Sequence, residues 1–364
     1  MSNIFENLLF KIKSAQSTRL LLLIVLLLVG IPAFSSTISY AETALPMLPD
    51  KGVAGWLGPG GPIAPPDLKG KVVLYDFWDY TCVNCIRTFP HLNLLYRTYK
   101  NKGLVIVGIH SPEFSFASLP SRVHQAILQY SLQFPVVLDR NQILWNKFHN
   151  HYWPADYLYD SHGHLVYHSF GEGGYAELEQ KIRDTLHLVT LNERSHTSKE
   201  FPEGLTPELY AGYDRGELGN KSGYHIGTVA DYSTTHLTGD RINLRGAWAA
   251  HSNHLASGNA KGHFFPSITV LYHGTGVNAV LKRSSENPDR REPVLIQVDG
   301  KQVRQKYAGK DLLSNSSGTH RQSMIAVHRA RMYSLVSGQP FGLHRIDLFF
   351  PHEGTEIYTL TFNP

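Results

Sequence analysis

The chain contains only two cysteines, Cys82 and Cys85, and their spacing suits a pair that forms and breaks a disulfide. Residues three positions apart on a helix share a face, and their Cβ atoms lie close enough for a disulfide across one turn. An apolar, strand-like run precedes Cys82, and apolar residues at helical spacing follow Cys85, so we expect the pair where a strand passes into a helix. The unpaired N–H groups and the dipole at that helix start favour a thiolate at Cys82. This is the chemistry of thiol–disulfide exchange.

Two elements must position the pair. The strand is expected over Val72 to Phe77, with Asp76 as its one charged residue, and the apolar positions of the helix are Ile86, Phe89, Leu92, Leu95 and Tyr99. Cys82 is nearer the helix start and the solvent, so it is predicted to attack, and Cys85 to resolve the mixed disulfide from one turn deeper. Asp76 is flanked by apolar residues and is predicted to be buried and poorly ionised, so that it takes and returns the proton of Cys85. The alternative for Asp76 is a hydrogen-bonded carboxylate at a strand end.

Two other uses of the cysteine pair fit the residues less well. A structural disulfide that closes so short a loop constrains the unfolded chain little. A zinc site needs further ligands, and the chain has no second cysteine pair. His164 and His168 have a suitable numerical spacing, but they read as alternate positions of one strand, too far apart for one ion. We therefore expect a redox-active pair that works without a metal or another cofactor.

Length and charge bound the rest of the molecule. A chain of 364 residues is long for one domain and comfortable for two. A formal net charge of +4 gives no strong electrostatic bias, so no nucleic-acid partner is implied.

The N-terminus has the layout of a secretory signal. Basic residues precede an apolar run from Leu20 to Val29 that extends to Phe34, and a small-residue cleavage site ends at Ala41. We expect residues 1–41 to be a signal peptide; the alternative is an uncleaved anchor, in which residues 20–34 tether the protein to the inner membrane. Either arrangement places the cysteines in the periplasm or another extracytoplasmic space, where disulfides form and persist.

The residues around the pair resemble thioredoxin. Asp76 and Trp78 precede Cys82 by six and four positions, and Pro90 follows Cys85 by five. The wider pattern is similar to the exported thioredoxin-like domains of TlpA-, ResA- and DipZ-type proteins, and it runs from Gly70-Lys71-Val72-Val73 to Arg87-Thr88-Phe89-Pro90. The resemblance implies an α/β thioredoxin fold over residues 42–190, a central mixed sheet with flanking helices. The periodicity agrees with it, since it predicts the order strand, helix, strand, helix, strand, strand, helix.

The resemblance also assigns substrate-binding residues. Thioredoxin-like folds place a cis-proline against the disulfide, and the residue before it offers its backbone to a bound substrate. These roles fall on Pro154 and Trp153. Trp78 and Trp153 flank the site by register, and the alternative for both is an ordinary core aromatic.

Two departures from the related domains indicate the direction of exchange. Asp79 stands where those domains usually carry threonine, and a carboxylate so near Cys82 disfavours the thiolate. The dipeptide Val83-Asn84 contains no histidine or other cation, so nothing there stabilises the reduced form as in strongly oxidising thiol enzymes. Both departures predict a reductant or a disulfide shuttle.

The second half of the chain changes character. Residues 191–225 are polar and broken by glycine and proline, which predicts a connector. Residues 226–364 show several period-two apolar segments, which predict an all-β sandwich. This part resembles the C-terminal module of DipZ-type proteins, which implies a jelly-roll-like fold of carbohydrate-binding type with a glycan as its ligand; the alternative is a docking or spacer domain. Sugar binding needs exposed aromatic rings, and the aromatic residues of this part are expected to lie mostly in the core: Trp248, Tyr272 and Tyr333.

The combined features predict an exported thiol–disulfide oxidoreductase that reduces oxidised envelope proteins, with apocytochrome c as one substrate to consider. A DipZ-type membrane thiol carrier is expected to supply the electrons in trans, because only a signal precedes the redox domain. One alternative is a thiol peroxidase of the same fold, although the spacing before Cys82 differs from that of peroxidases. Another is a glycan-binding adaptor whose cysteine pair is vestigial.

Overall fold

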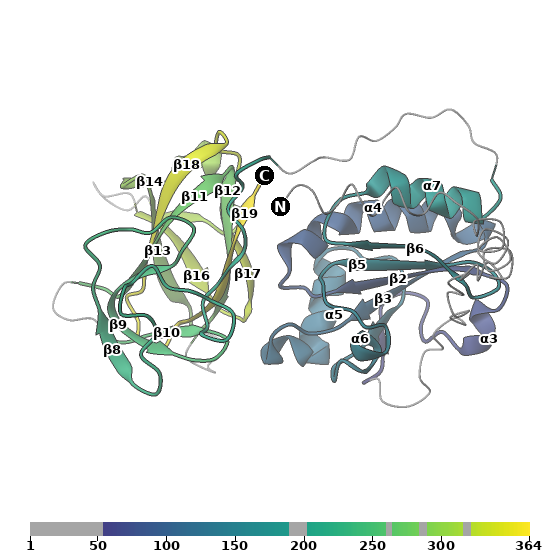
Figure 1. Ribbon diagram of the computed structural model, residues 1–364, viewed down its shortest axis with the longest axis horizontal. Coiled ribbons are helices and arrows are strands. Elements are labelled where there is room, and N and C mark those ends of the chain that lie inside the picture. Colours follow the sequence, from purple (N-terminus) through teal and green to yellow (C-terminus); the bar gives the residue numbers. More distant parts are fainter. Residues whose placement is uncertain (1–53, 189–201, 260–263, 284–289, 316–321) are drawn as a thin grey trace, which may run out of the picture. The chain divides into compact units, whose positions relative to one another are not determined.

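The computed structural model describes residues 54–188, 202–259, 264–283, 290–315 and 322–364. The predicted signal, residues 1–41, and the first part of the predicted connector, residues 191–201, lie outside these ranges. The described residues form an α/β module followed by an all-β module, as predicted (Figure 1). Among the described helices, none combines the length and apolar character needed to cross a membrane.

A mixed six-stranded sheet forms the centre of the first module. Its order is β1-β4-β3-β2-β5-β6, with the strands β1 (Trp56–Leu57), β2 (Val72–Trp78), β3 (Leu104–His110), β4 (Val136–Leu138), β5 (Ala155–Tyr159) and β6 (Leu165–Phe170). The β2–β3 and β3–β4 pairs are parallel, whereas β1, β5 and β6 pair antiparallel with their neighbours. All seven residues of β2 are buried, because helices cover both faces of the sheet at its centre. The predicted thioredoxin fold is confirmed.

Helices cover the two faces of this sheet. Side chains of α4 (Val83–Tyr99), α5 (Pro120–Gln129) and α7 (Tyr175–Thr185) share one core with one face of β2. The opposite face packs against α3 (Pro65–Leu68) and α6 (Ile143–Lys147). The 3-10 turns η1 (Lys100–Lys102) and η2 (Ser115–Ser118) complete the module. Figure 1 shows α4 and α7 side by side, and Tyr99 of α4 donates a hydrogen bond of 2.7 Å to Glu179 of α7.

The apolar spacing of Leu178, Ile182, Leu186 and Val189 predicts a helix from Tyr175 to about Val189, but helix α7 ends at Thr185. His187 adopts a left-handed conformation with φ of 53°, which stops the helix. Leu186 and Leu188 still pack against the core. Their apolar spacing therefore continues beyond the helix, which explains the longer prediction.

The second module consists of antiparallel strands and a short 3-10 turn. They are β7 (Leu209–Tyr210), β8 (Val229–Tyr232), β9 (Asn243–Ala250), β10 (Leu255–Ser257), β11 (Ser267–Gly274), β12 (Gly276–Lys282), β13 (Glu292–Val298), β14 (Lys301–Gln302), η3 (Gln305–Tyr307), β15 (Leu313–Asn315), β16 (Gln322–Val327), β17 (Arg331–Val336), β18 (Gly342–Phe349) and β19 (Glu356–Asn363). The hydrogen-bonded path runs β15-β16-β13-β18-β11-β9-β10-β19-β12-β17, and side chains from both halves of this path meet in one core. The all-β prediction is confirmed, whereas the jelly-roll connectivity stays a prediction.

The dipeptide Asp299-Gly300 is a hairpin signal in the sequence, and a tight turn there joins β13 to β14. Val298 pairs with Lys301, and the two turn residues have φ of 52° and 70°. Positive φ at both positions is typical of the type I′ turns that close two-residue hairpins.

The second module begins earlier than residue 226, so the predicted connector is too long. Strand β7 pairs with β19, and Ala211 is fully buried in the core of the second module. The Asn220 side chain accepts a hydrogen bond from the Leu244 N–H at 2.7 Å and donates one to the Leu244 carbonyl at 2.9 Å. The glycine- and proline-rich composition resembles a loop, but pairing with distant strands gives these residues a fixed place.

The three aromatic residues considered for sugar binding lie in the core of the second module. Trp248, Tyr272 and Tyr333 are 0%, 0% and 1% exposed. They stabilise the module by burial and cannot present a ring to a glycan in this conformation.

Candidate active site

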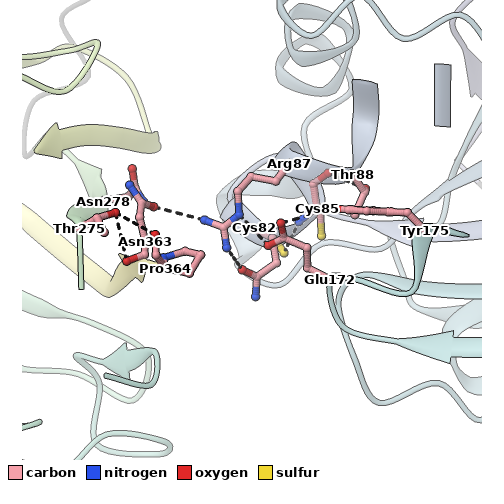
Figure 2. Close-up of polar contacts among 11 residues, drawn as sticks. Cys82, Cys85, Arg87, Thr88, Glu172, Tyr175, Thr275, Asn278, Asn363 and Pro364 are labelled. Atoms are coloured by element: carbon pink, nitrogen blue, oxygen red, sulfur yellow. Dashed lines mark hydrogen bonds and ion pairs between the residues drawn. The ribbon is translucent and has the colours of Figure 1, made fainter. Parts of the chain in front are cut away.

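The cysteine pair lies where β2 passes into α4. Cys82 is the N-cap of α4, and its Sγ accepts a hydrogen bond of 3.2 Å from the backbone N–H of Cys85 (Figure 2). Asp79, in the loop before the helix, accepts hydrogen bonds from the N–H groups of Thr81 at 2.9 Å and Glu113 at 2.6 Å. Asp79 thus ties the loop before the helix to the segment that contains Glu113. Cys82 caps the helix and Cys85 lies in its first turn, as predicted.

Both thiols are held in their neutral form. Cys85 is fully buried, and burial raises its pKa well above the usual value. Cys82 is partly exposed, yet burial also raises its pKa, and the hydrogen bonds from Cys85 offset this only in part. The expectation that the helix start makes Cys82 a thiolate is therefore wrong for this conformation, because desolvation outweighs the helix contribution.

Two glutamates that were not predicted from the sequence act on Cys82. The charges of Glu113 and Glu208 both raise the pKa of this thiol. Arg215 Nη1 lies 2.7 Å from Glu113 Oε1, and the Tyr210 hydroxyl lies 3.2 Å from Glu113 Oε1 and 3.0 Å from Glu208 Oε2. Burial raises the pKa of Glu113 to about 8. Glu113 and Glu208 are thus carboxyls that disfavour the Cys82 thiolate, and no local motif in the sequence marks either of them. The predicted effect of Asp79 stays a prediction.

Asp76 lies on β2, the strand that leads to the cysteine pair, and is 1% exposed. Burial, followed by the neighbouring carboxyl of Asp156, raises the pKa of Asp76 well above its usual value. The charge of Asp76 in turn raises the pKa of Cys85. The burial predicted for Asp76 is present, and its role in proton transfer stays a prediction.

Trp78 belongs to the core and not to a substrate surface. It is fully buried, and its ring packs edge-on against Phe89 at 5.2 Å and His110 at 4.9 Å between ring centroids. The prediction that Trp78 contacts substrate is wrong for this conformation, because no part of the ring reaches the surface. His110 was not predicted; it is 1% exposed and stacks on Tyr80.

The predicted substrate-binding pair lies at the start of β5. The peptide bond between Trp153 and Pro154 is cis, as the resemblance implies. The Trp153 ring is partly exposed and lies 4.0 Å from the Trp145 ring between centroids, and its Nε1 donates a hydrogen bond of 2.9 Å to the Ser111 carbonyl. Trp153 is therefore oriented by its neighbours and still reaches the surface, whereas contact with a substrate stays a prediction.

Arg87 connects the first turns of α4 to two other parts of the chain. Its guanidinium donates hydrogen bonds to Glu172 Oε2 at 2.6 Å, to Asn84 Oδ1 at 2.5 Å and to Asn363 Oδ1 at 3.2 Å (Figure 2). The sequence shows no cation between the cysteines, but Arg87, three positions after Asn84 on the same helix, reaches the Asn84 side chain. Arg87 thus holds the cysteine-bearing turn against the loop that contains Glu172.

Comparison with known families follows this division into two modules. Residues 48–168 match the AhpC/TSA family, and residues 206–363 match the thioredoxin-like C-terminal domain family. The first match thus falls on the α/β module and the second on the all-β module. The second match also begins near residue 206, where the structure places the start of the second module.

Similar proteins span one or both modules. Protein DipZ of Mycobacterium tuberculosis is 32% identical over 283 residues, which cover 73% of this chain and 40% of DipZ. The thiol-disulfide oxidoreductase ResA of Bacillus anthracis is 34% identical over 117 residues, or 32% of this chain and 65% of ResA. The solution structure of an oxidised thioredoxin-like protein is 26% identical and covers 40% of this chain and 97% of its own, with a TM-score of 0.36. The resemblance to DipZ- and ResA-type domains is confirmed, and the chain spans less than half the length of DipZ.

Proposed function

We propose that the chain is a thiol–disulfide oxidoreductase that reduces disulfides of exported proteins. The observation that carries the proposal is the geometry of the pair: Cys82 Sγ caps α4 and lies 3.2 Å from the N–H of the buried Cys85. Cys82 is the accessible sulfur and attacks the substrate disulfide, and Cys85 then resolves the mixed disulfide. The pair itself carries the two electrons, so no further cofactor is needed.

The direction of exchange is argued from the state of the thiols. Strong thiol oxidants owe their potential to a stabilised reduced form. Here burial and nearby carboxyls raise the pKa of both cysteines, so the thiolate is not stabilised. This supports a low reduction potential and a role as a reductant.

The partners follow from the direction and from the relatives. The similarity to DipZ and to ResA supports a place outside the cytoplasm, where a membrane thiol carrier would reduce the Cys82–Cys85 disulfide. Oxidised envelope proteins, with apocytochrome c as one substrate to test, would receive the electrons. Trp153, partly exposed beside the cis-proline, is the residue we assign to backbone contact with them.

Trapping with single cysteine variants tests this proposal. Cys85→Ser should accumulate mixed disulfides at Cys82, because the attack proceeds and the resolution does not. Cys82→Ser is the matched control and should trap none. A reduction potential near that of thioredoxin, about −270 mV, is expected. If neither variant loses thiol-dependent reduction of a test disulfide, the pair is not the reacting group and the proposal is rejected.

Peroxide reduction is the second candidate, favoured by the match of residues 48–168 to the AhpC/TSA family. The raised pKa of Cys82 slows thiolate attack on a peroxide and on a disulfide alike, so it does not separate the two reactions. The spacing before Cys82, which differs from that of peroxidases, argues for disulfide exchange. The two activities are separated by adding peroxide to the reduced protein. Consumption of peroxide with a sulfenic acid trapped at Cys82 would support peroxide reduction, whereas slow consumption and fast disulfide exchange would support the first proposal.

A further inference from the structure

A second carboxyl faces Asp76 across the sheet of the first module. Asp156 of β5 is the direct cross-strand partner of Asp76 in β2, and Ser169 of β6 is the partner of Asp156. On the other side the partner of Asp76 is Gly108 of β3, which has no side chain. Residues directly opposite each other have Cβ atoms about 4.5–5.5 Å apart. This row therefore brings two carboxyls together and contains no cation.

Neither carboxyl has the partners that an ionised carboxylate needs. Among the described residues, both oxygens of Asp76 and Oδ1 of Asp156 are buried without a hydrogen-bond partner. The remaining oxygen, Asp156 Oδ2, accepts one long hydrogen bond of 3.5 Å from Ser169 Oγ. Buried polar atoms normally have partners, so three unpartnered oxygens in one row require an explanation. A proton held on the pair removes one of the two charges and provides that explanation.

Burial affects the two carboxyls to different extents. It raises the pKa of Asp76 well above the usual value, with the charge of Asp156 as the second cause. It raises the pKa of Asp156 to about 7. Two carboxyls this close do not ionise independently. Near neutral pH the pair therefore holds between one and two protons.

The groups packed around the pair leave its charge largely uncompensated. Cys85 of α4 lies in the same core cluster as the side chains that flank Asp76 and Asp156 on their strands. The other titratable groups nearby are Tyr167 of β6, Tyr175 and Glu177 of α7, His91 of α4, and the ion-paired Arg87 and Glu172. The Asp156 charge raises the pKa of both tyrosines, so they too are neutral near pH 7. Of the two cationic candidates, Arg87 is bound to Glu172, and the His91 ring packs on Tyr175 at 4.8 Å.

We propose that Asp156 is a positioning residue of the redox centre that holds a proton jointly with Asp76, so that the pair both accepts and returns the proton of Cys85. The inference rests on the proposed thiol–disulfide function. A single Asp76 kept protonated by burial could only donate a proton. The second carboxyl supplies the vacant position that lets the site also accept one.

The proton and the electrons balance over one cycle. With substrate bound to Cys82 as a mixed disulfide, Cys85 gives its S–H proton to the carboxyl pair, and the Cys85 thiolate attacks Cys82 Sγ. The Cys82–Cys85 bond forms, the bond from Cys82 to the substrate sulfur breaks, and the substrate thiolate takes a proton from water. When a dithiol donor later attacks Cys82, Cys85 leaves as a thiolate and takes the proton back from the pair. The second donor thiol, giving its proton to water, then displaces Cys82, which takes a proton from water, and the donor leaves as a disulfide.

Carboxyl titration in the full chain tests the pairing. We would label aspartate carboxyl carbons with ¹³C in a Cys82→Ser, Cys85→Ser background, where no thiol titrates, and follow them by NMR against pH. Asp156→Asn should lower the pKa of Asp76 by roughly one to two units, and Asp76→Asn should lower that of Asp156 by the same amount, because coupling between two sites is reciprocal. Asp160→Asn, at the end of the same hairpin, is the control and should move neither.

The outcomes separate this inference from the proposed function. If the pKa of each aspartate is the same in the parent and in the variant that lacks the other aspartate, the pairing is rejected, whatever the redox activity. If a variant does not fold, the NMR titration of the parent protein is the test. Raised pKa values for both carboxyls, with each titration affecting the other, support the pair, and their absence rejects it. With the cysteines restored, the rate of disulfide reduction should lose its inflection near pH 7 in Asp156→Asn and keep it in Asp156→Glu. An inflection that persists in Asp156→Asn would also reject the inference.

Discussion

Removing the Arg87 guanidinium should destabilise the first module by an amount that the structure lets us estimate. Arg87→Ala deletes three hydrogen bonds, and the most consequential is that to Glu172 at 2.6 Å. The side chains of Arg87 and Glu172 are 25% and 14% exposed, so the variant leaves a largely buried carboxylate without its cation. Hydrogen bonds to charged groups contribute about 1.5–3 kcal/mol, and removing one partner of a fully buried pair costs about 3–5 kcal/mol. Partial exposure lowers the expected loss to about 2–3 kcal/mol.

A double-mutant cycle isolates the pair. The double variant Arg87→Ala/Glu172→Gln should lose less free energy of unfolding than the two single variants lose together, by about 1–2 kcal/mol. The reason is that Glu172→Gln removes the charge that Arg87→Ala leaves unpaired. Calorimetric unfolding of the full chain measures each variant, and Arg87→Ala should lower the melting temperature by about 5 °C.

Arg241→Ala provides the matched control. Its pair with Glu217, at 2.6 Å, is 40% and 71% exposed, and exposed pairs contribute about 0–1 kcal/mol. If Arg87→Ala lowers the free energy of unfolding no more than Arg241→Ala does, or if the losses in the double-mutant cycle are additive, the Arg87–Glu172 pair does not stabilise the fold as a buried pair would.

Two further predictions concern packing and pH. A Cβ at Gly108 would lie 2.9 Å from the Trp78 ring nitrogen, so Gly108→Ala should cost about 1–3 kcal/mol in urea unfolding, whereas Gly239→Ala, with no atom within 4 Å, should stay within about 0.5 kcal/mol of the parent. The pKa of Asp156 is raised from 3.8 to about 7, so its stabilising contribution is present below pH 4 and is lost as pH rises through 7. Between pH 4 and 8 the parent should therefore lose on the order of 4 kcal/mol more than Asp156→Asn, because one pKa unit corresponds to about 1.4 kcal/mol. Asp160→Asn should show the opposite sign, because the pKa of Asp160 is lowered, and equal slopes for all three proteins would contradict the reasoning.

Most of the chemistry of the site can be predicted from the sequence because the signals for it lie in short segments. Cys82 and Cys85 fall between a continuous apolar run and a run with helical spacing, and this switch alone places them at a strand-to-helix junction. The burial of Asp76 follows from its apolar neighbours on β2. The position of the cis-proline came from the family resemblance, since cis X–Pro bonds are a minority form of about 5%.

The expected thiolate at Cys82 shows where local reasoning fails. A helix start stabilises an anion, but the degree of burial depends on what packs above the helix. The carboxyls that act on Cys82 come from residue 113, after β3, and from residue 208, in what appeared to be a connector. Composition could not indicate that either approaches the sulfur.

The sequence by itself predicted which residues react, and it determined on which kind of element they lie, because periodicity and chain-neighbour spacing are properties of short segments. Only the tertiary structure decided their electrostatics: Asp156 opposite Asp76, Glu113 near Cys82, and Arg87 between Glu172 and Asn84. Strand register and helix packing join residues far apart in the chain, and a shift of one residue in register would reverse the face on which each side chain lies. The pKa of every group at this site depends on that register.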